Sequence, residues 1–361
     1  MNMKWGMYLN TAKPPDFTER EVLENALFYG QIAEETGFES GWVLEHHFTN
    51  YGLCGSPMVM ASFVLGATRK LKIGTAINVL PIEHPVRLAE QVALLDHMSN
   101  GRFILGIGRG FFDKDFAVFG VDIRNTRKIF QDWYEIMRDA WTKGTVAGNS
   151  EFLKFPAVPV QPKPISDPVP VVVASMSPST IEWVAKNNLS MIMQHDIEHE
   201  AKVANIELYN ETSRQHGHDP SKVEHTLSMV VGVGRNGDEI REKCRRYLLW
   251  FEQEVEHAQN IVNIVREHKV EAYDWHLQYW RQAALKGDTP IPRVVSNLLR
   301  LNPIGTPEEC IKTIQQIVDA TGVSRIVCAF EAAGKREDVL QSMKLFNEEV
   351  RPHIKPAKKK T

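Results

Sequence analysis

The sequence predicts an α/β fold in which eight parallel strands, each followed by a helix, close into a barrel. The clearest observation is the stretch 72–122, where two apolar runs, Ile73–Val79 and Phe103–Ile107, flank an amphipathic helix that begins at Pro85. Two buried strands joined by one such helix form a βαβ unit, whose strands run parallel. Strand and helix patterns then alternate almost throughout the chain without an obvious linker. This alternation favours a (β/α)8 TIM barrel with insertions, as a single domain over residues 1–361.

Each predicted strand is a short apolar run, of the kind that is buried on both faces of a parallel sheet. The eight runs are Trp5–Leu9, Gly41–Leu44, Ile73–Val79, Phe103–Ile107, Val169–Ala174, Leu189–Met193, Leu227–Val233 and Ile326–Phe330. The alternating segment Gly144–Pro168 interrupts this order and predicts a short antiparallel excursion.

The predicted helices are placed by their end signals as well as by apolar spacing. Thr18 with Glu21 three residues later is a capping box, Gly101 ends the helix that Pro85 begins, and Thr306 opens the last helix but one. The remaining predicted helices follow the same logic: Pro57–Ala67, Asn125–Trp141, one beginning in the STIEW segment, His199–Gln215, one from Asp238 to about Asn263, and a final one to Val350.

The chain is longer than the fold needs. A barrel of this class has about 250 residues, so insertions add on the order of 100. The largest is Ile264–Leu301, which is rich in Arg, Lys, Asp and Trp and contains Gly287, Pro290 and Pro292. A long irregular segment in a compact barrel is usually a functional lid or disordered. We therefore predict a mobile lid over about 264–301, after the helix of the seventh strand.

Composition excludes several classes of function. The chain is 43% hydrophobic and 24% charged, with a net charge of -3, which is typical of a globular protein and gives no electrostatic case for binding nucleic acid or membrane surfaces. No apolar run approaches the roughly 20 residues of a membrane span, and no signal sequence is visible. The four cysteines have no paired spacing, which indicates reduced thiols in a cytoplasmic protein.

Function in such barrels lies at the carboxyl ends of the strands. Arg109 follows the fourth strand between two glycines, and hydroxyl residues follow the fifth strand at the start of a helix: Ser175, Ser177, Ser179 and Thr180. An arginine facing hydroxyls and free backbone amides at a helix start suits a phosphate group. The alternative for the hydroxyls is an ordinary helix cap.

The second strand ends in Glu45, His46 and His47. Side chains alternate along a strand, so we expect only one of the two histidines to face the mouth of the barrel. A metal site would need a third ligand, for which His84 or Glu331 is available, but adjacent histidines suit two ligands poorly. The sequence is also consistent with two histidines that only pack against their neighbours, and with Glu331 as a salt-bridge partner at the rim.

Several segments, spread in order over nearly the whole chain, resemble the bacterial luciferase family of flavin-dependent monooxygenases, and in particular its catalytic alpha subunit. They are WVLEHHF, NVLPIEHPVRLAEQVALLDHMSNGRF, GRGFFDKDFAVFGVD, STIEW, NPIGTPEEC and FEAAG. The resemblance implies a (β/α)8 barrel that dimerises through helices near the second and third strands, as a homodimer or a luciferase-like heterodimer. It also implies reduced FMN (FMNH2) from a separate NAD(P)H:flavin reductase, and O2 as co-substrate captured as a flavin 4a-hydroperoxide.

The resemblance also implies roles for particular residues. His46, His47 and Asp115 match catalytic or near-flavin positions, and Arg109, Ser177, Thr180 and the Met176 amide match ligands of the FMN phosphate. Ala76–Ile77 matches a non-proline cis peptide beneath the flavin, and Glu331 matches an acidic residue near it. An imidazole with an ordinary pKa near 6.5 suits His46 for acid–base catalysis.

Three positions near the implied flavin depart from the family pattern: Gly108 replaces a cysteine of some luciferases, His195 a tryptophan, and Met176 a carboxylic residue. We therefore expect a two-component monooxygenase that oxidises an aldehyde or ketone other than the straight long-chain aldehyde, with little or no light. The alternatives are a true light-emitting alkanal luciferase subunit, a deazaflavin-dependent dehydrogenase, a non-catalytic flavin-binding subunit and, outside flavins, a barrel metallohydrolase.

Overall fold

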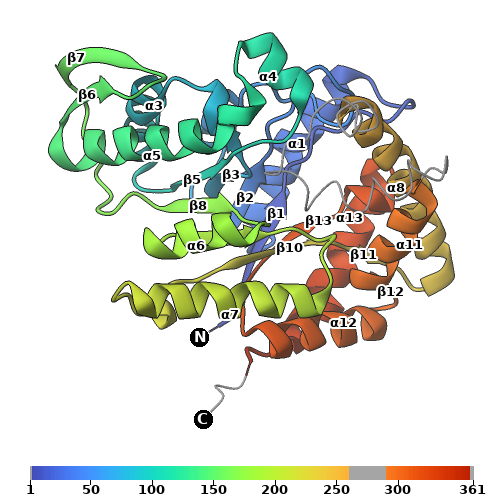
Figure 1. Ribbon diagram of the computed structural model, residues 1–361. Coiled ribbons are helices and arrows are strands. Elements are labelled where there is room, and N and C mark those ends of the chain that lie inside the picture. The colour runs from blue at the N-terminus through green and yellow to red at the C-terminus, as the bar shows by residue number, and fades with distance from the viewer. Residues whose placement is uncertain (1, 260–289, 358–361) are drawn as a thin grey trace.

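The computed structural model describes residues 2–259 and 290–357, and within them the strands form a closed parallel barrel (Figure 1). The sheet order is β3-β2-β1-β13-β10-β9-β8-β5-β4, and a further pairing of β3 with β5 closes the ring. The strands are β1 Lys4–Tyr8, β2 Ser40–Val43, β3 Lys72–Thr75, β4 Asn78–Val79, β5 Phe103–Gly108, β8 Val171–Ala174, β9 Ser190–Met193, β10 Thr226–Val230 and β13 Arg325–Ala329. The predicted eight-stranded barrel is confirmed, with β3 and β4 sharing one position.

The predicted strand Ile73–Val79 is divided into β3 and β4, and the peptide bond between Ala76 and Ile77, which lies between them, is cis. Before the break, the Thr75 hydroxyl takes over the pairing with β5: it accepts from the Gly106 amide at 2.8 Å and donates to the Gly106 carbonyl at 2.9 Å. A Cβ at Gly106 would lie 1.7 Å from the Thr75 carbonyl oxygen, so only glycine allows this approach. Beyond the break, Asn78 and Val79 pair with the end of β5.

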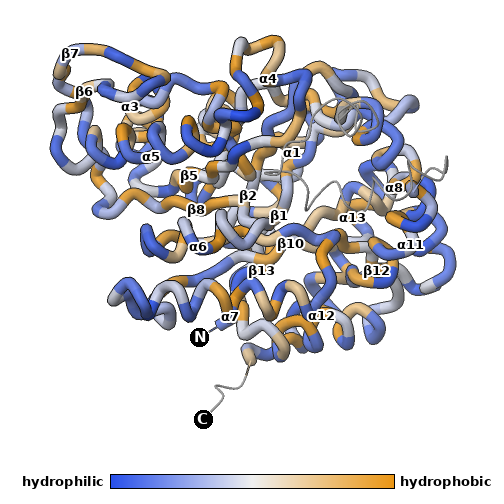
Figure 2. Tube along the Cα trace, viewed as in Figure 1, coloured by the Kyte–Doolittle hydropathy of each residue, from blue (hydrophilic) through white to orange (hydrophobic). Residues whose placement is uncertain are grey.

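Helices cover the outside of the barrel (Figure 1). They are α1 Glu19–Glu35, α2 Pro57–Ala67, α3 Pro85–Ser99, α4 Asp113–Phe119, α5 Thr126–Lys143, α6 Pro178–Lys186, α7 His199–Gln215, α8 Gly237–Gln259, α11 Ile291–Leu301, α12 Pro307–Thr321 and α13 Arg336–Leu345. Figure 2 shows apolar residues concentrated along the central strands and mixed with polar ones along the outer helices. None of the described helices combines the length and apolarity that crossing a membrane requires.

The interior of the barrel is filled by side chains, which form a layer that closes its lower part. Its members come from five strands, β2, β5, β8, β9 and β13: Trp42, Ile104, Val172, Ile192 and Val327. Tyr8, Ala76, Ile77 and Ala174 pack on this layer. The barrel is therefore a packed core with a floor, and open space begins only above it.

The excursion after α5 is an antiparallel hairpin, as the alternating sequence predicts. β6 (Thr145–Asn149) pairs with β7 (Lys154–Pro159), and Figure 1 shows the hairpin projecting from the barrel beside α3 and α5.

The predicted lid over 264–301 is wrong for its last part, while 264–289 lies outside the described residues. Residues 291–301 form α11, a helix that packs against α8 and buries Ile291, Val295, Leu298 and Leu301. Pro290 and Pro292 suggested an irregular segment, but proline is compatible with the first turn of a helix, where its missing N–H leaves no hydrogen bond unmade.

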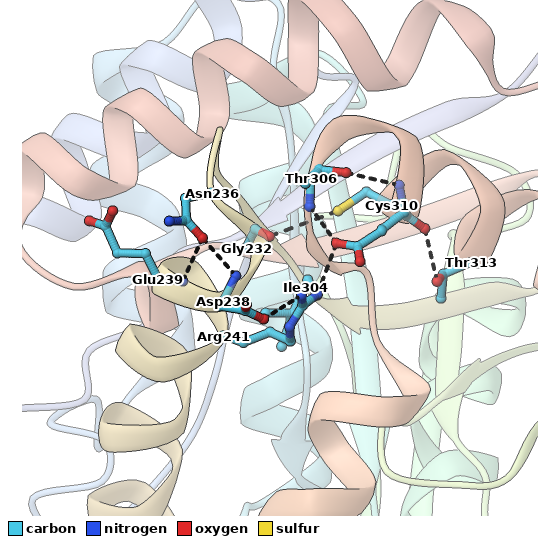
Figure 3. A network of polar contacts seen from close by, with 10 residues as sticks. Gly232, Asn236, Asp238, Glu239, Arg241, Ile304, Thr306, Cys310 and Thr313 are labelled. Atoms are coloured by element: carbon cyan, nitrogen blue, oxygen red, sulfur yellow. Dashed lines mark hydrogen bonds and ion pairs between the residues drawn. The ribbon is translucent and has the colours of Figure 1, made fainter.

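A polar network fixes the start of α8, the helix that later lines the functional cavity (Figure 3). The Arg241 guanidinium donates to the carboxylates of Glu309 at 2.8 Å and Asp238 at 3.0 Å. Thr306 and Glu309 form a capping box at the start of α12, next to the short β11–β12 pair (Gly232–Val233 with Ile304–Gly305). Arg241 thus ties α8 to α12, which holds the cavity-lining turns of α8 in place.

Candidate active site

A cavity of about 680 Å³ opens above the barrel floor, at the carboxyl ends of the strands. Nine of the residues that the sequence analysis singled out line it: His46, Ala76, Ile77, Gly108, Arg109, Met176, Ser177, His195 and Glu331. They follow six different strands, so closing the barrel is what brings them together. The cavity is also lined by α8 and α11, which the strand-end argument did not consider.

Three predicted site residues do not line this cavity in the described part of the chain: His47, Asp115 and Thr180. His47 points away from it, with its ring 4.8 Å from that of Phe119 and its Nε2 atom 3.0 Å from a Glu45 carboxylate oxygen. The expectation that only one of the two histidines faces the barrel mouth is confirmed.

His46 is the histidine that faces the cavity. Its ring lies 4.0 Å from the ring of Tyr51, centroid to centroid, and Gly52 packs so closely that a Cβ there would be 2.4 Å from the imidazole. Burial, together with the nearby charge of His47, lowers the pKa of His46 to about 3. The expected ordinary pKa near 6.5 is therefore wrong, and at neutral pH His46 is an uncharged base rather than an acid.

Two acidic residues, Glu45 and Asp115, act on His47, the neighbour of His46. Glu45 is buried and accepts a hydrogen bond from the Val79 amide at 2.8 Å as well as contacting His47. Burial alone lowers the pKa of His47, but the hydrogen bond and charge of Glu45 outweigh it and raise that pKa overall. Burial raises the pKa of Asp115 to about 6. Both carboxyl groups act on His47, and of the two residues only Glu45 lines the cavity.

The hydroxyl cluster and Arg109 follow β8 and β5, which are neighbours in the barrel. Ser177 precedes the first turn of α6, and its hydroxyl oxygen lies 2.9 Å from that of Thr180 instead of capping the helix. Arg109 and Ser177 both line the cavity, whereas the Ser175 hydroxyl is buried and donates to the Val173 carbonyl at 3.0 Å. A cation and a helix start at one end of a cavity favour an anionic group there.

The end of β13, across the barrel from Arg109, carries a polar group without a full set of partners. Glu331 accepts from the Asn10 amide at 3.1 Å through one oxygen, and burial raises its pKa to about 7. Its other oxygen and the hydroxyl of Tyr247 are buried, and neither has a hydrogen-bond partner among the residues that the structure describes. Unpaired buried polar atoms beside a cavity suit a ligand with its own donors and acceptors.

The sequence analysis missed several lining residues, among them Asn10, Tyr51, Tyr247 and Glu252. Asn10 follows the end of β1, so the strand-end argument that found Arg109 applies to it equally. Tyr247 and Glu252 lie inside α8, where nothing in the helix pattern marks which face meets the cavity.

The raised pKa of Glu331 has a measurable effect on stability. Between its ordinary value of 4.5 and about 7, the folded protein retains a proton that the unfolded chain has lost, so stability falls as pH rises through this window. We expect Glu331→Gln to raise the free energy of unfolding by on the order of 1–3 kcal/mol at pH 8.5 and to have little effect at pH 4. Urea denaturation at both pH values measures this. The exposed Glu337→Gln is the matched control, and an equal effect of the Glu331 substitution at both pH values would contradict the assignment.

The donor set fits a flavin phosphate better than a metal ion. Within residues 2–259 and 290–357, no three His, Cys, Asp or Glu side chains are grouped so that they could hold a metal ion. The metal alternative with His84 or Glu331 as third ligand therefore has no support there. The cavity instead offers Arg109 and Ser177 at one end, and the unpaired atoms of Glu331, Tyr247 and His46 along its walls.

The chain matches the family model described as luciferase-like monooxygenase over residues 3–325. It is 42% identical to an alkanal monooxygenase alpha chain of a Kryptophanaron alfredi symbiont, over 98% of this chain and 99% of the relative. It is 43% identical to one from Photorhabdus luminescens, over 98% and 97%. An alkanal monooxygenase beta chain of Aliivibrio fischeri is 32% identical over 79% of this chain and 89% of its own length.

Solved structures share the fold. A monooxygenase from Streptomyces bottropensis superposes with a TM-score of 0.81 at 23% identity, covering 97% of this chain and 99% of its own. The oxygenating constituent of the Pseudomonas putida 3,6-diketocamphane monooxygenase, a type II Baeyer–Villiger enzyme solved with FMN, gives 0.77 at 18% identity, covering 99% and 100%. At these identities the likeness extends to the barrel architecture alone.

Proposed function

This chain belongs to the family of luciferase-like monooxygenases, and we propose that it oxidises a carbonyl compound with O2 and reduced FMN. The observation that carries the proposal is one cavity that holds both the Arg109–Ser177 end and His46. The overall change is FMNH2 plus O2 plus an aldehyde giving FMN, a carboxylic acid and water, or an ester from a ketone.

Reduced FMN, when bound, supplies the two electrons that activate O2. Arg109, the Ser177 hydroxyl and the backbone amide of Met176 would hold its phosphate, because these residues present positive charge and donors at one end of the cavity. The Thr180 hydroxyl, which lies 2.9 Å from that of Ser177 but does not line the cavity, would orient the Ser177 hydroxyl. Glu331 and Tyr247 would pair with polar atoms of the ring system, since each has a buried atom without a partner in the described chain. These contacts would orient the cofactor above the barrel floor.

His46 would move the proton that oxygen transfer to a carbonyl requires. Its imidazole is neutral because burial lowers its pKa to about 3, so a ring nitrogen is available to accept a proton at neutral pH. Tyr51 and Gly52 fix the ring against the wall, which keeps its direction constant.

A single-turnover experiment tests the proposal. The protein is mixed anaerobically with FMNH2, then with oxygen and either decanal or 2-decanone, and product, hydrogen peroxide and photons are measured. We expect carboxylic acid or ester with little or no light. Binding of a reduced deazaflavin in preference to FMNH2 would favour the dehydrogenase alternative, and FMNH2 binding without any product would favour a non-catalytic subunit. Bright emission with decanal would identify a true luciferase subunit.

We also propose a partner at the face formed by α2 and α3. This face exposes four large apolar side chains: Val59, Phe63, Leu94 and Met98. Such a patch on two adjacent helices suits a second chain, either a copy of this one or a beta chain like that of the relatives. A flavin reductase in the same compartment, the cytoplasm, would supply FMNH2.

Phe63→Glu is expected to shift the purified protein from dimer to monomer, because it places a charge in the centre of an apolar contact. Light scattering after gel filtration measures the mass. Ile165→Glu, an equal change at another exposed apolar side chain, is the control and should leave the mass unchanged. A native protein that is already monomeric, alone and mixed with a relative's beta chain, would exclude this interface.

A further inference from the structure

We infer that Glu252 makes this enzyme select carbonyl substrates that carry a second, uncharged oxygen, a hydroxyl or another carbonyl, away from the reacting group. The inference rests on the proposed function and names the substrate class of the same cavity. It stands on the position of one buried carboxyl group among apolar side chains of α8 that line the cavity.

Glu252 lies on the face of α8 that lines the cavity, together with Leu248, Phe251 and Val255. It is only 9% exposed. Within the described residues its carboxyl group has no hydrogen bond or ion pair, although it borders open space. A buried carboxyl without a partner is costly, so a ligand that completes it gains affinity.

The ring contacts next to Glu252 lead to His46, where we propose that the substrate reacts, and not to Arg109 and Ser177, where we propose that the phosphate binds. Its neighbour Phe251 packs edge-on against Tyr51, with ring centroids 5.0 Å apart, and Tyr51 in turn lies against His46. The chain of contacts Glu252, Phe251, Tyr51 and His46 therefore links the carboxyl to the residue proposed to move the proton.

The protonation state decides which group pairs with Glu252. Burial raises its pKa to about 8, and the negative charge of Asp196 contributes to this rise. At neutral pH the carboxyl is therefore mostly protonated and offers an O–H donor. A neutral oxygen accepts from it directly. Asp196, which also lines the cavity and whose negative charge acts on Glu252, disfavours an anionic substrate end at this point.

The experiment compares ω-hydroxyaldehydes of eight, ten and twelve carbons with unsubstituted aldehydes of the same lengths. The native protein is expected to favour the hydroxyaldehyde at one length by about 3- to 10-fold in kcat/KM, the scale of one neutral hydrogen bond. Glu252→Leu should abolish this preference. Glu252→Gln should retain it, because an amide also donates without charge. Glu254→Leu, the same change on the same helix at a residue outside the cavity lining, is the control.

A binding measurement separates this inference from the proposed function. Calorimetric titration with 1,10-decanediol and 1-decanol needs no turnover, and the diol is expected to bind more tightly to the native protein and to Glu252→Gln, but not to Glu252→Leu. The inference is overturned if the preference survives in Glu252→Leu, or if the native protein shows none in either assay. A preference for a decanal with a terminal trimethylammonium group, lost in Glu252→Gln, would also overturn it. Selective diol binding without any oxidation would instead refute the proposed function alone.

Discussion

Arg109→Ala is expected to bind FMNH2 about 10- to 100-fold more weakly than the native protein, while its affinity for reduced riboflavin stays the same. Arg109 lines the cavity at the end of β5, next to the Ser177 and Thr180 hydroxyls at the start of α6. A hydrogen bond to a charged group contributes about 1.5–3 kcal/mol, which corresponds to that range of affinity. Riboflavin lacks the phosphate and so loses nothing.

Anaerobic fluorescence titration with both flavins measures the two affinities. Arg20→Ala removes an arginine that is exposed and paired with Glu24 on the surface, so it controls for a general change of charge. The phosphate assignment fails if Arg109→Ala still binds FMNH2 as tightly as the native protein does.

His46→Ala is expected to bind FMNH2 normally and to form oxidation product at least about 100-fold more slowly, the usual scale for a general acid or base. Because burial lowers the pKa of His46 to about 3, this histidine stays neutral from pH 5 to 8 and contributes no loss of activity in that range. A change of rate near pH 6–7 in the native enzyme would come from Asp115 or Glu331, whose pKa values are raised to about 6 and about 7.

Single-turnover rates from pH 5 to 8 test both statements. The exposed His353→Ala serves as the control, and added imidazole is expected to restore part of the rate of His46→Ala by filling the vacated space. Full turnover by His46→Ala would refute the catalytic role. A fall in rate as the pH drops through 6–7 that is seen in the native protein but not in His46→Ala would show that the pKa of His46 is not lowered.

The barrel and the strand ends that carry Arg109 and Ser177 were predictable because both depend on local pattern. Buried parallel strands are continuous apolar runs, and amphipathic helices repeat at 3.6 residues, so the strands and their order follow from residue types alone. Arg109 and Ser177 could be paired because neighbouring parallel strands end at the same edge. Alternation along a strand predicted that only one of the two histidines faces the cavity, and the structure agrees, with His46 as that residue.

Other features depend on neighbours that lie far away in the sequence. The pKa of His46 is set by burial among groups from several loops, which no local pattern reports. The same is true of α11, where prolines suggested an irregular lid although apolar side chains spaced along one helix face pack against α8. The sequence around a residue shows its chemical type, whereas its burial depends on residues that are distant in the sequence.

By itself the sequence determined the eight strands of the barrel, most of its helices, and which charged and hydroxyl residues follow the strand ends. Only the tertiary structure decided that Tyr247 and Glu252 face the cavity and that His47 does not. The physical reason is that periodicity fixes which side chains share a face of a helix, whereas the packing of that helix against the rest of the barrel decides what the face meets.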